Sequence, residues 1–134
     1  MSELRFLTAN DVTAIHDRVM AASNQDSTDL VRPEALESAV HSARNLAWYE
    51  GAGASAISAH LAIHIALAHP WVDGNKRTAA TSGILFARYN GARQTSADEA
   101  LQFGQLLIKY IESSHEERVA IIKEFVELVD GWFD

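Results

Sequence analysis

Apolar residues recur along this chain with the three-to-four-residue spacing of amphipathic helices, and the pattern persists from end to end. The first such stretch carries Val12, Ile15, Val19 and Met20, and Thr8 stands where a helix-capping threonine is expected. A polar segment then interrupts the pattern. The spacing therefore predicts a helix that begins just after Thr8 and ends before this segment.

The second and third predicted helices are separated by two glycines. Pro33 stands where a proline is tolerated in the first turn, and apolar positions continue from it to residue 47. Residues 48–53 are interpreted as a loop, because two of the last three are glycine. A third helix over 54–68 should end before residue 69, because the residue that precedes Pro70 is driven out of the α region.

Three more helices follow a tight loop at 71–76. The fourth runs to Asn90–Gly91, a common C-terminal stop. Ser96–Glu99 and Ser114–Glu117 are capping-box patterns that open the fifth and sixth helices. The last helix has so wide an apolar face that it must pack against the rest of the domain.

These elements predict an all-α fold, an orthogonal bundle of about six helices that forms a single domain over residues 1–134. No convincing strand is seen, although a short extended segment near Trp48 or at 93–95 stays open. Domains of this length bury enough surface to be stable without covalent staples.

Composition narrows the function classes. The chain has no cysteine, which excludes disulfides, thiolate zinc sites and cysteine nucleophiles and favours a reducing cytoplasm. Its net charge of -7 argues against a broad nucleic-acid interface. Residues 51–72 contain no charged side chain, but their histidines, serines and proline indicate a buried segment of a soluble domain rather than a membrane span. No signal peptide is evident at the N-terminus.

Reactive residues concentrate in the turn 69–78, His-Pro-Trp-Val-Asp-Gly-Asn-Lys-Arg-Thr. The start of the following helix has unpaired N–H groups and the positive end of the helix dipole. Gly74 leaves the backbone open there, and Lys76 and Arg77 add two positive charges. The segment therefore predicts a phosphate-binding turn.

Two further groups in this turn fit phosphoryl transfer. Asp73 supplies the hard oxygen ligand that Mg²⁺ prefers beside substrate phosphates. His69 could take a proton from an attacking hydroxyl. Each residue alone has a structural explanation: Asp73 could cap a helix, Asn75 could close a turn, and the cations could be solvated. The combination within ten residues favours a site.

The same segment resembles the signature of the Fic/Doc family, His-Pro-Phe-x-Asp/Glu-Gly-Asn-Gly/Lys-Arg, with Trp71 in place of the usual phenylalanine. Residues 6–16 and 32–40 are also similar to the N-terminal part of Doc-type proteins. The resemblance implies a Fic/Doc-like bundle. It also implies that His69 is the general base and that Asp73 is the Mg²⁺ ligand. The residues that would bind ATP phosphates are Gly74, Asn75, Lys76 and Arg77.

The resemblance further implies a flap at 48–54, a short β-hairpin that aligns a substrate peptide. AMP-transferring members usually have glycine where this chain has Lys76 and a second arginine where it has Ala80. Both changes resemble the Doc toxin branch. The implied function is transfer of the γ-phosphate of ATP to a hydroxyl of a target protein, a translation elongation factor in that branch. The alternative is adenylyl transfer.

Fic-type enzymes are often inhibited by a Ser/Thr-x-x-x-Glu-Gly/Asn helix. Residues 95–99 and 113–117 match only its spacing and are interpreted as helix starts, which implies restraint by a separate antitoxin protein.

Two more distant alternatives stay open. A metal hydrolase would use His60, His64 and Asp73, since the two histidines have the spacing of paired ligands on a helix. A non-catalytic module would only bind nucleotide. The remaining histidines, His16 among them, are expected on the surface or in helix packing.

Overall fold

The computed structural model describes residues 3–133, which form six helices. Their bounds are α1 Ala9–Ala22, α2 Pro33–Glu50, α3 Ala54–Ala68, α4 Asn75–Tyr89, α5 Ala97–Glu112 and α6 His115–Asp130. Within the described residues the only extended pairing is an isolated antiparallel bridge between Leu30 and Trp71. The all-α prediction is confirmed.

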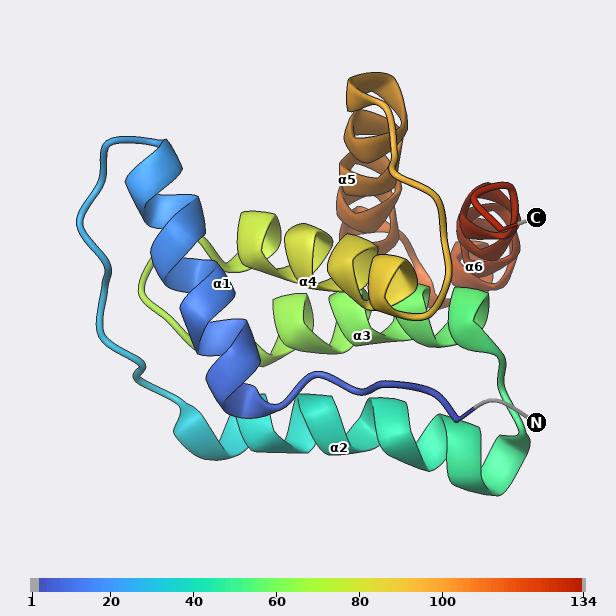
Figure 1. Cartoon of the computed structure of the whole chain (residues 1–134), viewed down its shortest axis with the longest axis horizontal. Coiled ribbons are helices and arrows are strands. Elements are labelled where there is room, and N and C mark those ends of the chain that lie inside the picture. The colour runs from blue at the N-terminus through green and yellow to red at the C-terminus, as the bar shows by residue number, and fades with distance from the viewer. Residues whose placement is uncertain (1–2, 134) are drawn as a thin grey trace.

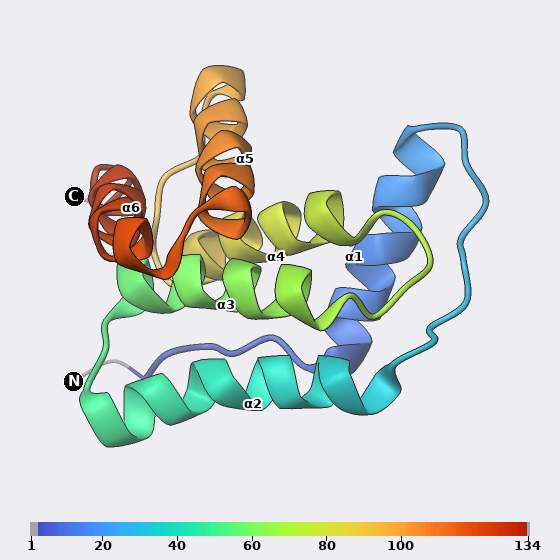
Figure 2. The ribbon, with the colours of Figure 1, turned by 180° about the vertical axis from the view of Figure 1, so that it is seen from behind.

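The helices form an orthogonal arrangement around α3 (Figures 1 and 2). α3 runs between α2 and α4, while α1 and α5 cross this layer steeply and α6 is seen nearly end-on. α3 buries nine of its 15 residues, because it contacts α2, α4, α5 and α6. The uncharged segment of the sequence is thus the central helix, and no described helix is long and apolar enough to cross a membrane.

Three helices begin with capping boxes: the two that were predicted, and a third at Thr8, where only a capping threonine was expected. In each box the hydroxyl of the cap accepts from a backbone N–H, and the carboxylate three residues later accepts from the N–H of the cap. The pairs are Thr8 with Asp11, Ser96 with Glu99, and Ser114 with Glu117. The glutamates with the spacing of an inhibitory helix therefore serve as caps.

The loop predicted at 48–53 is confirmed only for residues 51–53, and the β-hairpin flap expected at 48–54 is not formed. α2 continues through Glu50, and only residues 51–53 connect it to α3. The helix ends at Gly51, whose φ of 65° lies in the left-handed region that favours glycine. Trp48 and Tyr49 are therefore helical, with 81% and 82% of their surface exposed, and no described residue here or at 93–95 belongs to a strand.

Candidate active site

The candidate site lies on the connection between α3 and α4. α3 ends at Ala68, and His69 follows in the left-handed region with φ 49°, an uncommon conformation for a residue with a side chain. The segment before α2 holds this strained turn. Val31 N–H donates to the Pro70 carbonyl at 2.8 Å, and Arg32 Nη1 donates to the His69 carbonyl at 2.8 Å.

Trp71 fixes the turn to α1 through its buried side chain. Its indole is 1% exposed and stacks on His16 of α1, with ring centroids 4.1 Å apart and an angle of 3° between the planes. His16 is fully buried, and its Nε2 lies 2.9 Å from the Asp73 carbonyl. Because a carbonyl only accepts, His16 carries its proton on Nε2. One residue of α1 therefore contacts both Trp71 and Asp73 of the loop.

His16 belongs to the site, although the sequence pattern alone does not place it there. It was expected only on the surface or in helix packing. The available signal was its position between Val12 and Met20, which places an imidazole on the buried face of α1. The sequence pattern does not show that this face packs against a loop more than 50 residues away. His16 binds the Asp73 carbonyl of that loop.

Gly74 is required by packing as well as by conformation. Its φ is 81°, and a Cβ added there would lie 2.6 Å from Met20 Sδ and 3.3 Å from His16 Nε2. The missing side chain thus makes room for α1. This is a different reason from the expected one, which was access for a phosphate.

Asn75 points into the loop. Its side chain accepts from Trp71 N–H at 2.9 Å and donates to the Trp71 carbonyl at 2.7 Å. Its Nδ2 also lies 3.0 Å from His69 Nδ1. The amide therefore closes the turn, and the contact that Asn75 offers to a ligand is its backbone N–H.

The N-terminus of α4 offers several unpaired donors. The first hydrogen bond of the helix runs from Thr78 N–H to the Gly74 carbonyl at 2.9 Å, so the N–H groups of residues 75–77 precede the helical ladder. Asp73 is exposed, and its Oδ1 accepts from Gly74 N–H at 2.7 Å, which leaves Oδ2 for another partner. A hard oxygen beside anion-binding amides fits a Mg²⁺ ion shared with phosphate groups.

The two cations of the turn differ in their surroundings. Lys76 is exposed and has no hydrogen-bond or ion-pair partner among residues 3–133. Arg77 donates to Gln25 Oε1 at 3.0 Å and makes a very short contact with Ser23 Oγ, both just after α1. Lys76 is therefore the more accessible of the two positive charges for binding a ligand.

A hollow of about 450 Å³ brings all the predicted site residues together. It is lined by His69, Val72, Asp73, Gly74, Asn75, Lys76, Arg77 and Ile108. The model of the Fic/DOC family matches residues 6–87, which is more than half of the chain and includes the whole loop. This chain belongs to the Fic/DOC family. No curated protein matches it closely.

Fic/DOC proteins generally transfer nucleotide-derived groups to other proteins. The matched region ends within α4 and leaves out α5 and α6. Ile108 of α5 nevertheless lines the hollow, so α5 also shapes the candidate site of this Fic/DOC chain.

The histidine pair of α3 does not form a metal-ligand group with Asp73. Among residues 3–133 no cluster of three or more His, Asp or Glu is placed to hold a metal. His60 and His64 lie side by side, with centroids 6.1 Å apart. Burial lowers the pKa of both, and the charge of His64 lowers that of His60 further. Both imidazoles are therefore neutral at pH 7.

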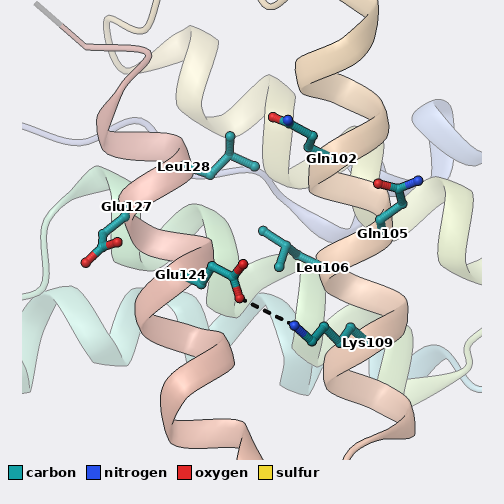
Figure 3. Close-up of a pocket in the computed structure, with 7 residues that line it drawn as sticks. All are labelled: Gln102, Gln105, Leu106, Lys109, Glu124, Glu127 and Leu128. Atoms are coloured by element: carbon teal, nitrogen blue, oxygen red, sulfur yellow. Dashed lines mark ion pairs between the residues drawn. The ribbon is translucent and has the colours of Figure 1, made fainter.

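A second hollow, of about 530 Å³, lies between α5 and α6 (Figure 3). Its residues include Lys109 and Glu124, whose charged groups form an ion pair at 3.6 Å across the groove. It has no histidine and no helix N-terminus. None of the predicted site residues lies in this second hollow.

Proposed function

We propose that this chain is a Doc-like toxin that transfers the γ-phosphate of ATP to a hydroxyl side chain of a target protein. The observation that carries the proposal is the exposed Lys76 beside the unpaired amides at the start of α4. A lysine there places a positive charge against phosphate groups where AMP-transferring relatives have room left by glycine. The Doc-like resemblance suggests a translation elongation factor as the target and a separate antitoxin as the restraint.

In the proposed reaction the target hydroxyl oxygen forms a bond to the γ-phosphorus, and the bond from that phosphorus to the ADP oxygen breaks. The hydroxyl proton passes to His69, and ADP leaves. The amides of residues 75–77 and Lys76 bind the phosphates, since charge-assisted hydrogen bonds are the strong ones. Asp73 would hold Mg²⁺, which when bound offsets phosphate charge.

The direct test is incubation with a cell lysate and ATP labelled at either the α or the γ phosphate. Transfer of the γ label to protein, lost in His69→Ala while ATP still binds, is the expected result. Transfer of the α label alone would replace the proposal by adenylyl transfer. Binding of ATP with no transfer of either label, unchanged by His69→Ala, would favour a non-catalytic module.

A second test concerns Lys76. We expect Lys76→Gln to weaken ATP binding roughly tenfold or more, because a hydrogen bond to a charged group contributes about 1.5–3 kcal/mol. Lys123→Gln is the matched control, since Lys123 is an exposed lysine on α6 outside the hollow. Equal affinities for the two variants in calorimetric titrations would contradict the assigned role.

A further inference from the structure

The side chain of Asn75 is held in a single orientation by the backbone of Trp71. An N–H group only donates and a carbonyl only accepts. Trp71 N–H lies 2.9 Å from one amide atom, which must be Oδ1, and the Trp71 carbonyl lies 2.7 Å from the other, which must be Nδ2. Turning the amide over would break both bonds in a residue that is only 6% exposed.

This orientation sets the protonation of His69. Asn75 Nδ2 has no acceptor capacity, and it lies 3.0 Å from His69 Nδ1. Nδ1 must therefore accept, and an accepting ring nitrogen carries no proton. The neutral His69 ring consequently has its proton on Nε2, so that this nitrogen is a donor.

Proton uptake by His69 conflicts with this bond. A base needs an unprotonated nitrogen, and the unprotonated nitrogen of His69 is the one that Asn75 occupies. If the proton moves from Nε2 to Nδ1, two N–H groups face each other. If the ring becomes doubly protonated, the same clash arises. Every route by which His69 takes up a hydroxyl proton therefore breaks the contact between Asn75 and Nδ1.

We propose that Asn75 is a positioning residue that holds His69 of the free chain in the Nε2-protonated tautomer, so that the base is formed only when the Asn75–His69 hydrogen bond is released. The role of that base rests on the proposed function, whereas the tautomer is a property of the chain alone. The turn is thus a latch: the amide that closes the loop around Trp71 also withholds the lone pair that transfer requires.

The test is the tautomer itself. Two-bond ¹H–¹⁵N spectra of protein labelled with ¹⁵N-histidine, recorded at mildly alkaline pH without nucleotide or target, distinguish protonated from unprotonated ring nitrogens. The His69 signals are identified by their loss in His69→Gln. We expect an unprotonated Nδ1 and a protonated Nε2 in the full chain. A proton on Nδ1 would overturn the proposal.

Asn75→Asp supplies the converse measurement. A carboxylate only accepts, so we expect the His69 proton to move to Nδ1 in this variant. Asn45→Asp is the matched control, because Asn45 is an exposed residue of α2 and should leave the tautomer unchanged. An Asn75→Asp protein that folds and keeps the wild-type tautomer would contradict the latch. If this variant does not fold, the wild-type spectrum decides.

This experiment separates the two proposals. A protonated Nε2 in a chain that transfers no label would support the latch and reject the proposed function. A protonated Nδ1 in a chain that transfers γ-phosphate would do the reverse.

Discussion

Replacing Gly74 by alanine tests whether contact with α1 shapes the candidate site. Gly74 has φ 81°, and the added Cβ would lie 2.6 Å from Met20 Sδ. The left-handed conformation costs an L-residue roughly 1–2 kcal/mol, and an extra methyl group in a packed region costs about 1–3 kcal/mol. We therefore expect Gly74→Ala to lower the free energy of unfolding by roughly 2–5 kcal/mol, a large fraction of the stability of a small domain.

Two other glycines separate these contributions. Gly91 also has a left-handed φ, 105°, but a Cβ there meets nothing within 4 Å, so Gly91→Ala should lose only the conformational part, roughly 1–2 kcal/mol. Gly104 lies inside α5 with nothing within 4 Å, and Gly104→Ala should stabilise the chain by about 0.5–1 kcal/mol. Urea denaturation followed by circular dichroism measures all three.

A loss of stability in Gly74→Ala no greater than that in Gly91→Ala would show that the added Cβ does not clash with Met20. A double variant sharpens the test, since Met20→Ala removes the atom that the new Cβ would meet. Gly74→Ala should then cost less in the Met20→Ala background than in the wild type, so the double variant should lose less stability than the sum of the two single losses. Strictly additive losses would show that Met20 does not oppose the added methyl group.

The remaining predictions concern stability and titration. The hydrogen bond from the Arg93 side chain is the main cause that lowers the pKa of Glu99 to about 2. The stability that ionised Glu99 adds should therefore be lost as pH falls from about 4.5 to about 2. In Glu99→Gln the melting temperature should depend less on pH over that range. His64→Gln should raise the pKa of His60 in an NMR titration, because one repelling charge is removed, whereas an unchanged value would contradict that coupling. Since burial lowers the pKa of both histidines, unfolding should become easier as pH falls through 6.5. Trp71→Phe should lower the free energy of unfolding by about 1–2 kcal/mol, because phenylalanine is smaller than tryptophan and leaves a buried space unfilled. Urea unfolding without such a loss would contradict the role of Trp71 in fixing the turn.

Local signals in the sequence were sufficient for most of the helices. The capping boxes at Ser96 and Ser114 were predictable because a hydroxyl and a carboxylate three residues apart satisfy each other within one turn. The end of α3 was predictable because Pro70 excludes the residue before it from the helix. The end of α2 was placed three residues too early, because the apolar pattern stops at Ala47, whereas the helix continues through Glu50 to the left-handed Gly51.

For the candidate site, too, some features follow from the sequence and others only from the fold. The sequence by itself determined which residues share the turn, because His69 and Arg77 lie in one short segment at a helix start, and all its predicted members line one hollow. Only the tertiary structure decided their partners. His16 and Trp71 stack because α1 crosses beneath the loop, Gly74 makes room for that crossing, and Asn75 turns inward to His69. Spacing along a chain sets which groups are neighbours, whereas the protonation and availability of each group depend on atoms that only folding brings within hydrogen-bond distance.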